Sequence, residues 1–332
     1  MLKTRTINIG GVPLGTGHPV RIQSMTSTNT LDIDATLKQT LDLAEAGSDY
    51  VRITAPSLKA AKNLEVVKNA IEKKGIQLPL IADIHFNPAA AEIAAKIVDK
   101  VRINPGNYID RKYIRQTYNE NEYQLELRRI SDRIASLLDT CKLNNTAIRI
   151  GTNHGSLSGR ILEKFGNTPE GMVQSTLEYV DICRQHNFHQ LVLSLKSSNL
   201  QVMIASYRML VERMQELGYD YPLHLGVTEA GDAEDGRIKS AAGIGTLLSQ
   251  GIGNTIRVSL TEDPVKEIPV AKKILQYAIL KRQEKHGQNR MQYFSVSAEA
   301  GKIFPLVIGS ASNKKADLFE GKNKKRPTLA AK

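Results

Sequence analysis

The strongest constraint on the fold of this chain is a regular alternation of short apolar runs with longer helical patterns. Eight runs are rich in Val, Ile and Leu and are bounded by Gly, Pro or Asn, which is typical of strands buried in a parallel sheet. These predicted strands span residues 20–25, 50–55, 78–86, 100–105, 147–153, 190–197, 222–229 and 255–260. The predicted helices between them span residues 32–46, 57–74, 88–98, 168–186, 199–217, 237–250 and 264–285.

Eight strand-then-helix units within about 280 residues match the usual size of a TIM (β/α)8 barrel. A doubly wound open sheet is the alternative, but the G-x-G-x-x-G fingerprint of a dinucleotide site does not follow the first strand. We therefore predict a TIM barrel over residues 1–285.

Residues 107–146 interrupt the regular spacing, because they are long for one crossover between the fourth and fifth strands. They contain an acidic helical stretch at residues 119–139. This insertion predicts either an extra packing helix or a loop over the barrel mouth, and the sequence leaves the two open.

Charge is distributed unevenly along the chain. The formal net charge is +11, and residues 281–332 carry +8 of it, from 12 Lys and Arg against 4 Asp and Glu. We interpret residues 286–332 as a linker or the partial start of a following domain, with a basic tail that is predicted to be disordered. No aromatic platform or groove-reading motif accompanies the charge, so nucleic acid is not an expected partner.

Composition favours a cytoplasmic location. The chain has no run of 18 apolar residues and no N-terminal stretch of signal-peptide length, so neither a membrane span nor secretion is expected. Its two cysteines, Cys141 and Cys183, cannot form a disulfide framework or a closed zinc site. They also cannot supply the three or four thiolates of an iron–sulfur cluster, so we expect no metal site built from this chain's own residues.

Charged side chains interrupt almost every predicted strand, and in TIM barrels the active site forms where the strands end. The cations are Arg52, Arg102, Arg149, Lys196 and Arg257, and the strands offer only two obvious carboxylates, Asp83 and Glu229. By strand parity, His85 shares a side with Asp83, Asn104 with Arg102, Asn153 with Arg149 and Ser259 with Arg257. A structural ion pair is the alternative for any one of these residues. As a set they predict a cationic cup for a ligand with two or three negative charges.

Glycine-rich turns follow three of these strands, at residues 104–106, 151–156 and 229–231. Glycine lets backbone N–H groups approach an anion, although plain turn chemistry explains each turn equally well. Glu229 stands beside one of them among cationic neighbours, so it is a candidate acid/base, with a rim ion-pair partner as the alternative.

The motifs VRIQSMT, ADIHF, VRINPG, RIGTNHGSL, YPLHLGVTEAG and GIGNTIRVSLTEDPVKEI occur in order over residues 5–275. Together they resemble 4-hydroxy-3-methylbut-2-enyl diphosphate synthase, in its longer three-domain form. That resemblance implies a TIM barrel followed by a domain with a [4Fe–4S] cluster, a homodimer, and electrons from ferredoxin or flavodoxin. It implies an oxidoreductase of non-mevalonate isoprenoid biosynthesis that reduces 2-C-methyl-D-erythritol 2,4-cyclodiphosphate.

Carried onto this sequence, the resemblance implies roles for the strand-end residues. The cyclodiphosphate would be held by Arg52, Arg102, Arg149, Asn153, Lys196, Arg257 and Ser259, with Asn104 beside them. Glu229 would be the acid/base, and Asp83 and His85 would complete the catalytic floor.

One part of the family pattern is missing, because no cysteine follows Cys183 and neither C-P-x-C nor N-G-P-G-E occurs. We therefore expect a substrate-binding barrel whose cluster domain is absent, either by truncation or by degeneration of that domain. Such a chain would bind the cyclodiphosphate without reducing it. The alternatives are a pterin- or phosphate-binding TIM-barrel transferase and a non-catalytic diphosphate-binding remnant.

Overall fold

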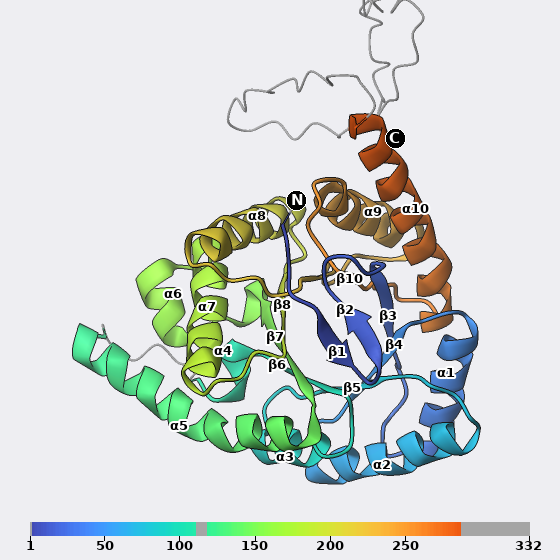
Figure 1. Cartoon of the computed structure of the whole chain (residues 1–332), viewed down its shortest axis with the longest axis horizontal. Coiled ribbons are helices and arrows are strands. Elements are labelled where there is room, and N and C mark those ends of the chain that lie inside the picture. Colours follow the sequence, from blue (N-terminus) through green and yellow to red (C-terminus); the bar gives the residue numbers. More distant parts are fainter. Residues whose placement is uncertain (1, 111–117, 287–332) are drawn as a thin grey trace, which may run out of the picture. The chain divides into compact units, whose positions relative to one another are not determined.

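The computed structural model describes residues 2–110 and 118–286, and within them eight parallel strands form the predicted barrel (Figure 1). The strands are β3 (Arg21–Met25), β4 (Tyr50–Thr54), β5 (Leu80–Asp83), β6 (Lys100–Ile103), β7 (Ala147–Asn153), β8 (Leu191–Lys196), β9 (His224–Leu225) and β10 (Thr255–Ile256). They are ordered β8-β7-β6-β5-β4-β3-β10-β9, and a parallel bridge between Leu193 and Leu223 closes the ring. The prediction of a TIM barrel is confirmed.

Helices surround the strands at positions close to the predicted ones. They are α1 (Ile33–Glu45), α2 (Leu58–Lys73), α3 (Pro88–Ala94), α7 (Pro169–Gln185), α8 (Leu200–Glu216), α9 (Ala233–Ser249) and α10 (Glu267–His286), with a short 3-10 turn at Pro264–Lys266. Side-chain caps fix several starts: Asp32 accepts from Ala35 N and Ser57 from Ala60 N. These caps replace hydrogen bonds that the first turn of a helix otherwise lacks.

The crossover between β6 and β7 contains α4 (Pro105–Tyr108) and the long helix α5 (Glu120–Asn144). The start of α5 has a capping box, in which Asn119 accepts from Glu122 N and the Glu122 carboxylate accepts from Asn119 N. The helix packs outside the barrel against α3 and α7 (Figure 1), and Arg133 on α5 pairs with Glu92 on α3 at 2.8 Å. The described part of the insertion is therefore a packing helix and not a loop over the mouth.

A hairpin of β1 (Ile7–Ile9) and β2 (Val12–Leu14) closes the end of the barrel at which the parallel strands begin. Ile7, Ile9 and Leu14 form an apolar cluster with Tyr50, Ile81, Ala147 and Val192 from four strands. The hairpin was not predicted, and neither were α4 and α6 (Gly159–Phe165). Because the hairpin seals this end, a ligand reaches the interior from the other end of the strands.

The linker and disordered tail were expected at residues 286–332; residue 286 ends α10, and residues 287–332 lie outside the described residues. In the described ranges, no helix is long and apolar enough to cross a membrane.

Candidate active site

The loops that follow β5, β6, β7, β8 and β9 surround a cavity of about 410 Å³ at the mouth of the barrel. Its lining is polar apart from one exposed aromatic ring, that of Phe86. The lining residues are His85, Phe86, Asn104, Asn107, Asn153, His154, Gly155, Ser156, Ser197, Ser198, Thr228 and Glu229. Four predicted site residues, His85, Asn104, Asn153 and Glu229, therefore meet at this cavity.

Four of the five predicted cations lie one step deeper, on strands β4, β6, β7 and β8, and the fifth, Arg257, directly follows β10. Arg52, Arg102, Arg149 and Lys196 are buried, with at most 6% of each residue exposed, and Arg257 is half-buried. Arg52 and Arg102 both contact the carboxylate of Asp83. These two contacts agree with the prediction from strand parity that the two side chains face the same interior.

Asp83 bridges the two arginines at the end of β5. Its Oδ1 accepts from Arg102 Nη1 at 3.1 Å, and its Oδ2 lies 3.5 Å from Arg52 Nε and 3.5 Å from His85 Nε2. Burial favours the protonated acid, but Arg52, Arg102 and His85 outweigh burial and hold the pKa of Asp83 well below its usual value. Asp83 is thus an ionised anchor for two guanidinium groups.

Arg257 has a carboxylate partner that the sequence did not single out, Glu267 at the start of α10. The Glu267 carboxylate is 1% exposed and accepts from Arg257 Nη2 at 2.9 Å and from Ser24 Oγ at 2.7 Å. The carboxylates therefore neutralise more of the positive charge of the cationic cup than the sequence predicted. Across the described barrel interior, five cations at this level share two carboxylates, those of Asp83 and Glu267.

Arg149 and Lys196 carry the remaining charge. Arg149 Nε and Nη1 are enclosed, and neither has a hydrogen-bond partner in the described structure. Burial, followed by repulsion from Arg52 and Arg102, lowers the pKa of Arg149 well below its usual value. A buried guanidinium without a partner is costly, so this position favours an anionic ligand or ordered water.

A second polar layer lies beneath the cations, near the hairpin. Lys100 starts β6, and its Nζ lies 4.8 Å from the centre of the Tyr50 ring. Lys100 Nζ and both ring nitrogens of His224 are enclosed without a partner in the described part of the barrel. Burial, and then repulsion from the other buried cations, lowers the pKa of both groups well below their ordinary values.

Two of the loop residues serve the protein's own geometry. Asn104 caps α4 by accepting from Gly106 N at 3.3 Å, and its Nδ2 donates to Ser156 Oγ at 2.8 Å. A Cβ on Gly106 would lie 1.7 Å from Ser156 O, so this glycine permits close packing of two loops. The expectation that this turn presents backbone N–H groups to an anion is therefore replaced by a packing role.

Glu229 is an exposed carboxylate on the cavity wall, and its backbone φ is +51°. A residue with a side chain adopts this left-handed conformation at a cost, which is met most often at turns and functional sites. Ser259 is half-buried and follows β10 by three residues. The structure thus places Glu229 at the cavity and Ser259 beyond the end of the adjacent strand.

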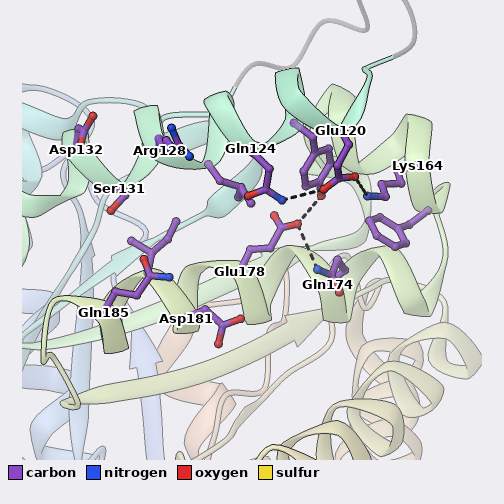
Figure 2. Close-up of a pocket in the computed structure, with 14 residues that line it drawn as sticks. Glu120, Gln124, Arg128, Ser131, Asp132, Lys164, Gln174, Glu178, Asp181 and Gln185 are labelled. Carbon is purple, nitrogen blue, oxygen red and sulfur yellow. Dashed lines mark hydrogen bonds and ion pairs between the residues drawn. The ribbon is translucent and has the colours of Figure 1, made fainter.

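A larger groove of about 490 Å³ lies outside the barrel between α5, α6 and α7 (Figure 2). Several of its polar groups bond one another: Glu178 accepts from Tyr123 Oη and from Gln174 Nε2, and Lys164 pairs with Glu120. These contacts attach α5 to the barrel. We therefore place the site at the mouth and not in this groove.

The cysteines do not fit an iron–sulfur cluster. Cys141 on α5 and Cys183 on α7 are both buried, and burial raises the pKa of the Cys183 thiol to about 12 and that of Cys141 further. No group of three or more His, Cys, Asp or Glu among the described residues could hold a metal ion.

Comparisons with known proteins agree with this picture. The model of the GcpE TIM-barrel domain matches residues 4–272. The 4-hydroxy-3-methylbut-2-en-1-yl diphosphate synthase (flavodoxin) of Bacteroides thetaiotaomicron is 46% identical over 98% of this chain and 54% of its own length. That of Akkermansia muciniphila is 54% identical over 81% of this chain and 46% of its own length. The chloroplastic ferredoxin form of Oryza sativa subsp. japonica is 46% identical over 91% of this chain and 41% of its own length.

Solved structures agree on the fold alone. The sialic acid synthetase of Leptospira borgpetersenii has a TM-score of 0.54 at 12% identity and covers 90% of this chain and 94% of its own. The dihydropteroate synthase of Yersinia pestis has a TM-score of 0.52 at 13% identity and covers 84% and 98%. The chain spans about half the length of the curated relatives it matches. It belongs to the family defined by the GcpE TIM-barrel domain, as the resemblance in its motifs predicted.

Proposed function

We propose that this barrel binds 2-C-methyl-D-erythritol 2,4-cyclodiphosphate at its mouth. It would thereby supply the substrate-binding part of an oxidoreductase that forms 4-hydroxy-3-methylbut-2-enyl diphosphate in isoprenoid biosynthesis. The relatives are synthases of the proposed product, 4-hydroxy-3-methylbut-2-en-1-yl diphosphate, and about half of the aligned residues are identical to theirs. The observation that best supports an anionic ligand is the excess of cationic side chains over carboxylates in the described barrel interior.

The proposed substrate ligands are those at the strand ends. They are Arg52, Arg102, Arg149, Asn153, Lys196, Arg257 and Ser259, with Asn104 holding the loop beside them. Guanidinium groups bind phosphate oxygens in pairs, and a cyclic diphosphate offers negative charge on both of its phosphorus centres. Because Asp83 and Glu267 already orient three of the arginines, little rearrangement is needed to receive the ligand.

Glu229 is the proposed acid/base, because it is the carboxylate on the cavity wall that a bound ligand can touch. His85 lies on the same wall and is tied to Asp83. Asp83 keeps its charge through its two arginines, so its proposed part in catalysis is to fix Arg52, Arg102 and His85 and not to transfer a proton.

The reductive part of the activity needs an iron–sulfur cluster, and the described residues of this chain do not fit one. We propose that the chain alone binds the cyclodiphosphate without reducing it, and that a cluster domain supplied separately receives electrons from ferredoxin or flavodoxin. A homodimer and a cytoplasmic location complete the proposal. Two buried free thiols support a reducing compartment, because such compartments keep cysteines unpaired.

Calorimetric titration of the full chain with the cyclodiphosphate tests the proposal. Arg149→Met is the sharpest variant, because it removes an unpartnered guanidinium and leaves no carboxylate unpaired. Loss of charge-assisted hydrogen bonds of about 1.5–3 kcal/mol predicts affinity at least about tenfold weaker. Arg213→Met, near the end of α8 where Arg213 pairs with Glu216 at the surface, is the matched control and should bind normally.

The competing functions give different titrations. A pterin-binding transferase would bind a dihydropterin, and neither inorganic pyrophosphate nor the cyclodiphosphate would displace it. Binding of the cyclodiphosphate with no turnover after addition of reduced ferredoxin supports our proposal. Failure of the wild-type chain to bind, or unchanged binding by Arg149→Met, contradicts it.

A further inference from the structure

The side chain of Met25 lies between two arginines of the barrel interior. Met25 is the last residue of β3, and β3 stands in the sheet between β4, which carries Arg52, and β10, which Arg257 directly follows. Met25 is also the register partner of Arg52. Side chains at paired positions of neighbouring strands lie on the same face of a sheet, so both face the interior.

Both arginines direct N–H groups at the sulfur of Met25. Arg52 donates to Met25 Sδ from Nη2 at 2.8 Å and from Nε at 3.1 Å. Arg257 Nη1 lies 3.6 Å from the same sulfur atom. A thioether sulfur is a polarizable, weak acceptor that carries no charge. The half-buried Met25 side chain therefore offers one uncharged acceptor to two cations.

Met25 joins two ion pairs of the described barrel. On one side, Asp83 Oδ2 lies 3.5 Å from Arg52 Nε. On the other side, Glu267 Oε1 accepts from Arg257 Nη2 at 2.9 Å. Each of the two arginines is thus held by a charged acceptor and by the sulfur of Met25.

An uncharged acceptor suits this place, because like charges meet there. Burial lowers the pKa of Arg52 to about 10, although Asp83 opposes the shift. Repulsion from Arg257 and Arg102 adds to it. A carboxylate at position 25 would relieve this repulsion, but it would also cancel positive charge that binds an anion. A leucine there would leave Arg52 Nη2 without the acceptor that the described structure gives it.

We propose that Met25 is a positioning residue of the anion site, whose sulfur fixes the guanidinium groups of Arg52 and Arg257 for a diphosphate without adding negative charge. Met25 acts through the two arginines and does not itself hold the ligand. The inference rests on the proposed function, because it concerns how the same site receives a diphosphate. Its distinctive consequence is that substitutions of Met25 separate affinity for an anion from stability of the fold.

The test is calorimetric titration of the full chain with inorganic pyrophosphate, together with urea denaturation of each variant. Met25→Leu should unfold near the wild-type midpoint, because exchanges of Met and Leu are tolerated in packed interiors. Its affinity for pyrophosphate should fall about fivefold, as expected when an ordinary hydrogen bond is lost. Met25→Gln has a side chain of similar length with an uncharged oxygen acceptor, and it should recover most of this affinity.

Met25→Glu separates the charge of the acceptor from its position. Its carboxylate can accept from both arginines, so the urea midpoint should stay level or rise. The affinity for pyrophosphate should nevertheless fall at least about tenfold, because the added negative charge opposes an anionic ligand. If Met25 only filled space, affinity would instead follow stability across the three variants.

Met172 on α7 provides a matched control. It is fully buried, and its Sδ accepts from Ser206 Oγ on α8 at 3.3 Å. Met172→Leu therefore removes a sulfur acceptor that contacts no arginine in the described structure, and pyrophosphate should bind as tightly as before.

Nuclear magnetic resonance of the chain labelled with methyl-13C methionine gives a direct readout. The Met25 signal is assigned by its loss in Met25→Leu, and that of Met172 by its loss in Met172→Leu. Pyrophosphate should shift the Met25 signal and leave the Met172 signal in place, because the ligand acts on the arginines that contact the Met25 sulfur.

Three results overturn the proposal. They are a wild-type chain that does not bind pyrophosphate, equal affinities of the wild-type chain, Met25→Leu and Met25→Glu, and a loss in Met25→Leu that Met25→Gln does not recover. The two proposals also fail separately. Cyclodiphosphate binding that these substitutions leave unchanged refutes the role of Met25 and keeps the proposed function. The expected order of pyrophosphate affinities in a chain that does not bind the cyclodiphosphate supports the role of Met25 and refutes the proposed substrate.

Discussion

The Glu267–Arg257 pair gives the sharpest test of how this barrel tolerates its buried charge. Each carboxylate oxygen of Glu267 accepts two hydrogen bonds. Oε2 accepts from Ser24 Oγ at 2.7 Å and Arg257 Nε at 3.3 Å, and Oε1 accepts from Arg257 Nη2 at 2.9 Å and Leu260 N at 3.3 Å. Glu267 thus ties α10 to β3 and to the strand end after β10.

Glu267→Gln keeps the size of the side chain but replaces one oxygen with a donor that faces other donors. It also leaves Arg257 without its carboxylate. Hydrogen bonds to charged groups contribute about 1.5–3 kcal/mol each, and removal of one partner of a buried pair costs about 3–5 kcal/mol. We expect Glu267→Gln to lower the free energy of unfolding by about 3 kcal/mol.

Urea denaturation followed by circular dichroism measures this loss. Glu262→Gln is the matched control, because Glu262 pairs with Arg237 at the surface, where solvent screens the pair, and its denaturation midpoint should hardly move. The double variant Glu267→Met with Arg257→Met should recover part of the stability, because no buried charge is left unpaired. A loss below about 0.5 kcal/mol in Glu267→Gln would refute the reasoning, since surface substitutions reach that size.

Three further outcomes follow from the same structure. The folded-state pKa of Asp83 is lowered, so the stability that its charge contributes is present above the unfolded pKa of about 3.9 and is lost as pH falls. Between pH 5 and 3, the melting temperature of Asp83→Asn should therefore fall less steeply than that of the wild-type chain. Gly106→Ala places a Cβ 1.7 Å from Ser156 O and should markedly lower the melting temperature, whereas Gly155→Ala, with no atom within 4 Å, should not. Arg160→Met removes the buried cation that pairs with Glu178 of α7 at 2.7 Å and should cost about 3–5 kcal/mol by urea denaturation.

The barrel could be predicted from the sequence because its strands are buried on both faces and read as continuous apolar runs. The hairpin floor was missed, although its signal is present. Gly10 and Gly11, both with positive φ, separate two short apolar runs, and two adjacent glycines favour a two-residue hairpin turn. Its strands have three residues each, which is too short for periodicity to mark them.

Strand parity identified the interior cations but not how they are paired. Arg52 and Arg102 could be assigned to the interior from alternation alone, yet nothing in the sequence indicates that both reach Asp83. Glu267 was missed because it begins a helix ten residues after Arg257, where no alternation marks it as inward-facing. An acidic residue in the first turn of a helix is usually explained by its favourable interaction with the helix dipole. That local explanation gave no reason to expect an ion pair between Glu267 and Arg257.

The ordering of charge along the barrel explains how one interior holds so many cations. At the floor, Tyr50 and the hairpin are apolar, and burial lowers the pKa of Lys100 just above them well below its usual value. One level higher, Asp83 and Glu267 hold three arginines in place. In the described barrel, Arg149 on β7 and Lys196 on β8 have no carboxylate partner. The proposed preference for a small anion would therefore depend on the placement of this charge and not on its total.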